Sequence, residues 1–287
     1  MSISLPSSKN ALEPLLDDLA RSTRKRILRD RAYGLEPHEE TLTQNIVSDL
    51  THALSASGSK SFAYEVPKYL EATVYGADIA FWIQNKAGQL AGILLQAKRQ
   101  FNRDDTYRDL DHSNKTGGQQ YTLLVESARA AGLLAGYVFY NGLNTGQPSS
   151  TACGLNLLDP DLHGITVASA LTLHRQGLIQ HSVSRVQVEK ATAPFGCLVR
   201  CGLRRQTTHP AQALYDWNIF ASPQAEQWAP VLYDASDTPD YLKPLLAAAD
   251  RPDGIVDVPQ YDVGYGYDDS EGDEGGAFVT VVLARMI

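Results

Sequence analysis

Three polar side chains interrupt two apolar stretches of the sequence in a way that could support chemistry. Asp78 directly precedes the apolar residues 79–82. Gln96 and Lys98 lie at the end of a second apolar stretch, which begins at Ile93. Because side chains alternate between the two faces of a strand, Gln96 and Lys98 project from the same face. A carboxylate, an amide oxygen and a lysine that converge suit the hydrolysis of a phosphodiester, since oxygen ligands bind Mg²⁺ or Mn²⁺ and the lysine positions or activates the attacking water.

A β-hairpin is the element that must bring these side chains together. Residues 75–83 and 92–98 have the composition of strands, and residues 85–88 form a polar turn between them. Antiparallel pairing through that turn would bring the Asp78 carboxylate within a few ångströms of Gln96, although the sequence alone leaves the register open.

A helix before the hairpin could supply a further acid. Pro37 is at a favoured first helical position, and Glu39 and Glu40 follow in the expected first turn. Adjacent helical side chains diverge by about 100°, so at most one of the two acids should point into the site. We expect Glu40, and with less support Glu39, to be that acid, although the helix dipole favours acids in a first turn whatever the function.

The remaining pattern predicts a mixed α/β protein. Helices are expected at three further places: 11–33, 119–131 and 164–176. A buried strand is expected at 136–140, and the last third contains short β-like runs at 183–188, 197–202 and 278–283. We therefore expect an N-terminal basic helix, a core and a β-rich C-terminal region of unknown role, with the boundaries 1–34, 35–178 and 179–287.

The two motif segments resemble the PD-(D/E)XK nuclease superfamily. Gly76-Ala77-Asp78 is separated by seventeen residues from Gln96-Ala97-Lys98-Arg99. This arrangement is similar to the Mrr-like restriction endonucleases, in which glutamine replaces the second acid of the motif. The resemblance covers residues 36–145 and implies an α/β fold with a restriction-endonuclease-like core, a central mixed sheet flanked by helices.

The resemblance also implies a set of site residues. An N-terminal helix supplies a glutamate in that superfamily, which Glu40 would match, and the helix after the motif strand carries a supporting polar residue, which Gln120 would match. The implied catalytic residues are Glu40, Asp78, Gln96, Lys98 and Gln120. Of these, Asp78, Gln96 and Glu40 would bind Mg²⁺ or Mn²⁺. The implied activity is that of a DNA endonuclease in bacterial defence, acting on double-stranded DNA.

Several alternatives remain open at this stage. The same core could serve as a nuclease toxin or a repair nuclease. It could also be a catalytically inactive binding or scaffold module, which the glutamine at position 96 favours. Asp78 could be an ordinary turn residue, and Gln96 with Lys98 could line the solvated face of an edge strand. The basic cluster between Arg21 and Arg31 could bind a phosphate backbone or form a solvated helix face.

The composition narrows the class of protein. The formal net charge of −8 argues against a protein that coats nucleic acid without specificity, but it allows a nuclease with one local basic groove. No apolar run is long enough to span a bilayer, so we expect no membrane partner and a cytoplasmic location. Cys153, Cys197 and Cys201 lack the spacing of a zinc site. A homodimer is one assembly that the sequence leaves open.

Overall fold

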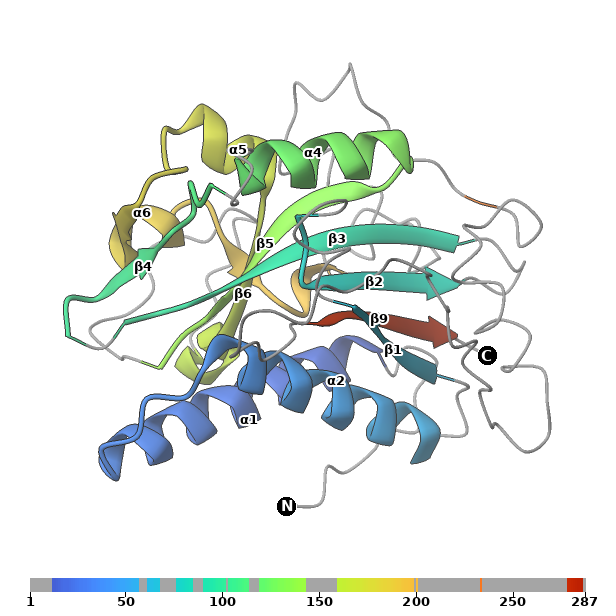
Figure 1. Cartoon of the computed structure of the whole chain (residues 1–287). Coiled ribbons are helices and arrows are strands. Elements are labelled where there is room, and N and C mark those ends of the chain that lie inside the picture. Colours follow the sequence, from blue (N-terminus) through green and yellow to red (C-terminus); the bar gives the residue numbers. More distant parts are fainter. Residues whose placement is uncertain are drawn as a thin grey trace, which may run out of the picture.

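The fold is a central β-sheet with helices on both faces (Figure 1). The computed structural model describes residues 12–56, 61–67, 76–84, 90–101, 103–113, 119–142, 159–198, 200, 233 and 278–285. Within those residues the sheet has seven strands in the order β1-β9-β2-β3-β5-β6-β8. They are β1 (Ser61–Pro67), β2 (Ile79–Gln84), β3 (Leu90–Arg99), β5 (Leu134–Tyr140), β6 (Ile165–Ser169), β8 (Ala193–Pro194) and β9 (Phe278–Arg285).

The sheet is mixed, as expected from the sequence. β2 and β3 form an antiparallel hairpin, whereas β3 and β5 run parallel. β6 then pairs antiparallel with β5. Every residue of β5 and β6 is buried, which matches the apolar character of β5 and the cover of both strands on both faces. The expectation of an α/β protein with a central mixed sheet flanked by helices is therefore confirmed.

Helices cover the two faces of this sheet in pairs. Figure 1 shows α1 (Leu12–Ala32) and α2 (Glu39–Ala56) on one side, and α4 (Gln120–Ala130) and α5 (Ala170–Arg175) on the other. The core is accordingly divided into two apolar clusters. Leu95 of β3 belongs to the cluster under α1 and α2, and Leu94 to the cluster under α4 and α5. The strand thus alternates between two buried layers.

The basic cluster of α1 is engaged within the fold. Arg21 pairs with Asp159 at 3.0 Å, and Arg26 pairs with Asp49 at 3.3 Å. Arg24 is buried and pairs with Asp161 at the 3₁₀ helix η2 (Pro160–Gly164). These ion pairs attach α1 to its neighbours.

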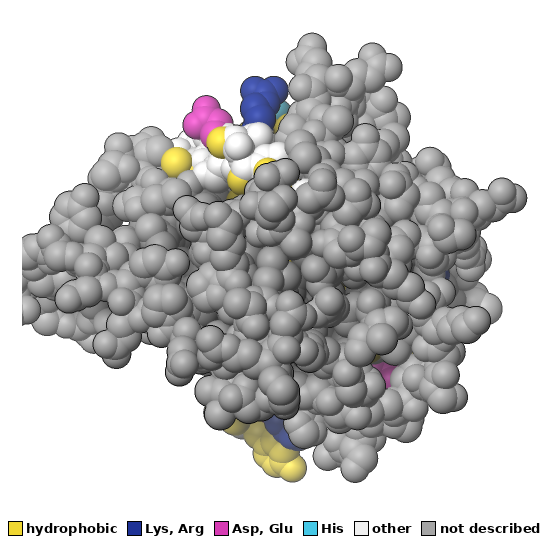
Figure 2. Space-filling view, turned by 90° about the vertical axis from the view of Figure 1, so that its right-hand side faces the viewer, with side chains coloured by type: hydrophobic (Ala, Val, Ile, Leu, Met, Phe, Trp, Pro, Cys, Tyr) yellow, Lys and Arg dark blue, Asp and Glu magenta, His cyan; other side chains and the backbone are white. Residues whose placement is uncertain are grey.

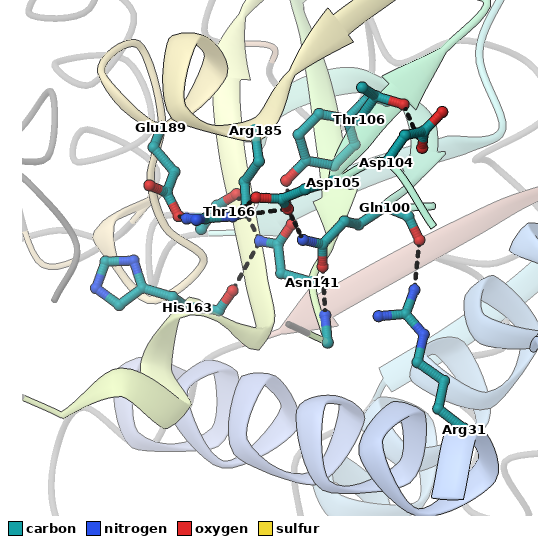
Figure 3. Close-up of polar contacts among 12 residues, drawn as sticks. Arg31, Gln100, Asp104, Asp105, Thr106, Asn141, His163, Thr166, Arg185 and Glu189 are labelled. Carbon is teal, nitrogen blue, oxygen red and sulfur yellow. Dashed lines mark hydrogen bonds and ion pairs between the residues drawn. The ribbon is translucent and has the colours of Figure 1, made fainter. Parts of the chain in front are cut away.

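A buried polar network holds the segment that follows β3 (Figure 3). Gln100 donates through Nε2 to Asp105, and its Oε1 accepts the N–H of Gly142 at 2.9 Å. Asp105 in turn accepts from Arg185 Nε at 2.9 Å. Nearby, Asn141 donates to the carbonyl of His163 at 2.7 Å. The network therefore fixes the course of the chain directly after β3.

Asp105 and Arg185 connect two further elements to this network. Asp105 precedes β4 (Thr106–Arg108), which pairs with β7 (Ser182–Ser184) in a separate two-stranded sheet. Arg185 begins the short helix α6 (Arg185–Glu189). The polar stretch after β3 is consequently an ordered part of the fold.

Three expectations of secondary structure were wrong. Residues 164–176 are the strand β6 followed by α5, because the Ser169 side chain accepts the N–H of Thr172 and starts the helix there. Residues 183–188 end β7 and then form α6, which begins with a capping box at Ser184 and Gln187. The segment expected as a strand at 197–202 is helical at Cys197, Leu198 and Arg200.

The expected division into three domains stays a prediction, although contacts across both of its boundaries are seen. β9 lies between β1 and β2 in the central sheet. Arg200 donates to Glu13 of α1 at 2.6 Å and also pairs with Asp17. The expected turn at 85–88, Cys153 and Cys201 lie outside the described residues.

In the view of Figure 2, the described part of the surface carries apolar, basic and acidic side chains near one another. None of the helices among the described residues is long and apolar enough to cross a lipid bilayer.

α1 packs closely against η2 at Gly164, so a substitution at this glycine tests whether α1 belongs to the core. A Cβ on Gly164 would lie 2.6 Å from Arg24 Cβ and would overlap the carbonyl oxygen of Ala20. We expect Gly164→Ala to lower the free energy of unfolding by about 1–3 kcal/mol, as overpacking does, measured by urea denaturation. Glu126→Ala, at an exposed position of α4, should change it by less than about 0.5 kcal/mol. Equal stabilities would mean that α1 is a loosely attached appendage.

Candidate active site

The candidate site is built where β3 extends beyond β2. The last residue pair between the two strands is Ile79 with Leu95, whereas β3 continues to Arg99 and stays paired with β5 on its other edge. Asp78 donates its own N–H to Leu95 O at 2.9 Å. In a strand, alternate N–H groups point to alternate edges, so those of Ala97 and Arg99 face the edge that β2 leaves open. Buried N–H groups of this kind need acceptors.

Two carboxylates accept those two N–H groups. Asp78 Oδ2 accepts from Ala97 N at 2.6 Å. Glu39 Oε2 accepts from Arg99 N at 2.9 Å. Backbone geometry alone therefore brings an acid from the start of β2 and an acid from α2 to neighbouring positions along the same open edge.

Gln96 and Gln120 extend this arrangement into a chain of hydrogen bonds. Gln96 Nε2 donates to Asp78 Oδ2, and Gln96 Oε1 accepts from Gln120 Nε2 at 2.6 Å. The Oε1 atom of Gln120 is buried and accepts no hydrogen bond from the described residues. Gln120 is the first residue of α4, so this helix start lies directly behind the motif strand.

Burial decides between two interpretations of Gln96 and Lys98. Gln96 is 2% exposed and Lys98 is 7% exposed, so they do not line a solvated edge strand. Burial of an amide and an ammonium is unfavourable unless polar partners surround them. The charge of Lys98 acts on Glu39, where it lowers the pKa. Both residues thus belong to the polar group at the open edge of β3.

The structure brings Glu39 rather than Glu40 to this edge. Glu40 is exposed on α2, whereas Glu39 is half-buried. Glu39 lies three and four residues before the buried Leu42 and Thr43, and this spacing continues the helix face that packs on the sheet. Thr43 also shares a 2.8 Å hydrogen bond with the hydroxyl of Tyr140, which anchors the first turn to β5. That spacing was the sequence signal that would have favoured Glu39.

The environment of Glu39 opposes its ionisation. Burial raises its pKa from 4.5 to about 8, and the neighbouring carboxylates of Asp78 and Glu40 act in the same direction. Lys98 and the backbone N–H of Arg99 lower the pKa but do not offset the burial. This environment therefore favours the protonated form of Glu39, and a cation placed between the acids would favour its ionised form.

The donor set suits a hard divalent cation. Asp78, Glu39 and Gln96 offer only oxygen ligands, and Mg²⁺ needs one or two carboxylates because it keeps several waters. Among the described residues, no three side chains of the His, Cys, Asp or Glu type lie close enough to hold a metal ion. A cation at this edge would therefore have the two carboxylates, the amide of Gln96 and waters as its ligands. The buried, unpartnered Oε1 of Gln120 shows that the polar group still has acceptor capacity. We conclude that the residues fit Mg²⁺ or Mn²⁺.

The raised pKa of Glu39 predicts a pH dependence of stability. A folded pKa above the unfolded value means that the folded state binds the proton more tightly, so stability falls as the pH rises between about 4.5 and about 8. Glu39→Gln should flatten this fall, as measured by urea denaturation in EDTA across that range. Glu40→Gln, which alters the exposed neighbour, should retain it. A wild-type slope in Glu39→Gln would contradict the raised pKa of this acid.

Comparison with known proteins yields a family but no activity. Residues 12–260 match DUF6615, which is described as a family of unknown function. The matched range contains every residue of the candidate site and ends before β9. No curated protein and no solved structure matches the chain.

Proposed function

We propose that the chain, which belongs to this family of unknown function, is a Mg²⁺- or Mn²⁺-dependent nuclease that cleaves double-stranded DNA. One observation carries the proposal. Asp78, Gln96 and Glu39 meet along the open edge of β3, and Lys98 lies on the same strand face as Gln96. The PD-(D/E)XK resemblance supplies the expected setting, an endonuclease of bacterial defence with a restriction-endonuclease-like core.

Each residue has a distinct role in this proposal. Asp78, Gln96 and Glu39 would hold the cation, which would stabilise charge on the phosphate and lower the pKa of a bound water. Lys98 orients the attacking water or donates a hydrogen bond to a phosphate oxygen. Its burial strengthens that interaction, because the surrounding medium screens charge less than bulk water does. Gln120 fixes the orientation of the Gln96 amide.

The amide of Gln96 must turn its oxygen toward Asp78 to act as a ligand. The oxygen and nitrogen of a side-chain amide are nearly equivalent in shape. Rotating the amides of both Gln96 and Gln120 by half a turn keeps the hydrogen bond between them, with donor and acceptor exchanged. It also moves the buried position that lacks a partner among the described residues from the Oε1 to the Nε2 of Gln120, and it sets the Gln96 oxygen against Asp78 Oδ2 in place of a hydrogen bond. A cation between those two oxygens would have to offset both effects, so the ligand role of Gln96 depends on the cation being bound.

One observation favours the second candidate, a binding or scaffold module without cleavage. Asp78 Oδ2 already accepts from Ala97 N and from Gln96 Nε2, and such bonds satisfy a carboxylate without a cation. An inactive module would keep this closed arrangement. Substitution of Lys98 separates the two candidates, because only a nuclease has a DNA cleavage activity to lose.

The first test removes the two most specific groups. We expect Asp78→Ala and Lys98→Ala to reduce cleavage of plasmid DNA in Mg²⁺ by at least about 10²-fold, because one removes a metal ligand and the other the group that assists the nucleophile. Asp49→Asn, which removes an acid from a surface ion pair of α2, should cleave at the wild-type rate. Circular dichroism should show folded protein in each case. Unchanged cleavage in either alanine variant would exclude this site, and a wild-type protein without activity in Mg²⁺ or Mn²⁺ would favour the binding module.

The second test compares two adjacent acids. Glu39→Gln should lower the cleavage rate by at least about 10²-fold, because the charged ligand is lost while the hydrogen bond from Arg99 N is kept. Glu40→Gln should leave the rate within about twofold, since this exposed acid is worth only a few tenths of a kcal/mol to the helix dipole. Equal effects of the two variants would remove Glu39 from the site.

A further inference from the structure

Two arginines and one glutamate form a second charged group next to the candidate active site. Arg99 Nη1 donates to Glu36 Oε2 at 3.2 Å. Arg31 Nε lies 3.6 Å from the same oxygen, close enough for an ion pair but too far for a hydrogen bond. Because Arg99 also donates its backbone N–H to Glu39, the two charged groups share one residue. Two positive charges and one negative charge leave a net charge of +1 in this second group.

Arg31 is an unusual arginine because its donors are buried without enough acceptors. Its side chain is 8% exposed, and its Nε and Nη1 atoms make no hydrogen bond to the described residues. Figure 3 shows its Nη2 atom directed at the carbonyl of Gln100, at 2.5 Å. Burial lowers the pKa of Arg31, and Arg99 acts in the same direction, whereas Glu36 raises this pKa without offsetting the burial. Unpaired N–H groups of a buried guanidinium are unfavourable, so an anion whose oxygens come within hydrogen-bond distance of them would stabilise them.

The side chain of Arg99 is held in place before any ligand binds. Its guanidinium lies over the ring of Phe101, 4.2 Å from the centroid. Arg108 lies over the same ring at 4.3 Å and pairs with Asp104 at 2.7 Å. A guanidinium that is already ordered loses little conformational freedom when it binds a ligand.

The Glu36 carboxylate contacts both arginines and lies on the side that faces solvent. Its side chain is 43% exposed, whereas those of Arg31 and Arg99 are 8% and 19% exposed. Asp105, the other acid that acts on Arg31, is bonded to Arg185 and Gln100. Glu36 is therefore the carboxylate that a ligand arriving from solvent would displace.

We propose that Arg31 and Arg99 bind a backbone phosphate of the DNA, and that the Glu36 carboxylate holds the place of that phosphate until DNA binds. This inference rests on the proposed nuclease function. Phosphate and carboxylate present similar oxygen geometry to a guanidinium, and the two non-bridging oxygens of a backbone phosphate could serve both arginines, whereas both now approach the single Oε2 atom of Glu36. The bound phosphate would fix the DNA strand beside Lys98 and the acids at the open edge of β3.

The test measures binding without cleavage. The affinity for a short fluorescent DNA duplex is measured by anisotropy in EDTA at several salt concentrations. Arg99→Ala should weaken binding about tenfold and reduce the slope of log K against log salt by about 1, as the loss of one phosphate contact does. Glu36→Gln removes the competing carboxylate and should strengthen binding by about threefold or more. This second variant alters an exposed side chain, so it stays informative if Arg99→Ala folds poorly.

Matched controls separate local contacts from general charge effects. Arg29→Ala removes an exposed arginine of α1 that pairs only with its neighbour Asp30 among the described residues, and Asp49→Asn removes an acid from another ion pair. Both should bind within about twofold of wild type, since isolated exposed charges contribute little. The inference is overturned if Glu36→Gln or a folded Arg99→Ala behaves like its control, even when the wild type binds and cleaves DNA. A wild type that binds no duplex at low salt would overturn both this inference and the proposed function.

Discussion

The open edge of β3 is the constraint on which the candidate site depends. β2 stops pairing at Leu95 while β3 continues, so the backbone N–H groups of Ala97 and Arg99 need acceptors from elsewhere. An unpaired N–H in a buried position costs about as much as a lost hydrogen bond, which is about 1–3 kcal/mol. Asp78 and Glu39 fill this need. The requirement of the backbone for acceptors is thus what brings the two acids together.

Burial has opposite effects on two neighbouring groups of this site. The same burial that strengthens the interactions of Lys98 also raises the pKa of Glu39 to about 8. A group of acids that opposes its own ionisation gains from a cation, because the cation removes the repulsion and the burial penalty together. The apolar layers under α2 and α4 keep the strand rigid enough for such a group to persist.

Local patterns predicted part of this site, and long-range packing explains the remainder. The strand composition of residues 75–83 and 92–98 and the short turn between them were enough to predict the hairpin, and the structure sets Asp78 beside Gln96 with the register that the sequence left open. Glu40 was preferred as the match to the glutamate that the resemblance implies, and the helix-dipole argument, which applies equally to Glu39 and Glu40, could not separate them. Glu39, and not Glu40, lies on the helix face of Leu42 and Thr43. That this face is directed at the sheet follows from the packing of α2 on β5, which the local sequence does not report.

Other features could not be derived from local sequence. The position of β9 between β1 and β2 joins segments that are far apart along the chain, so no local pattern reports it. Ser169 starts a helix within what was expected to be one continuous helix, since capping outweighs a weak apolar period there. Glu36 and Arg31 were ordinary charged residues in the sequence, and only their packing against Arg99 distinguishes them.

The most direct test of the central claim is an anomalous diffraction measurement on crystals of the protein grown with Mn²⁺. The open edge of β3 predicts a manganese peak in contact with the Asp78 carboxylate and the Gln96 amide oxygen, with Glu39 as a further ligand, and loss of that peak in Asp78→Ala. Crystals in which Mn²⁺ binds only elsewhere, or in which Asp78 stays bonded to Gln96 Nε2 with no metal beside it, would contradict the claim that this edge is a divalent metal site.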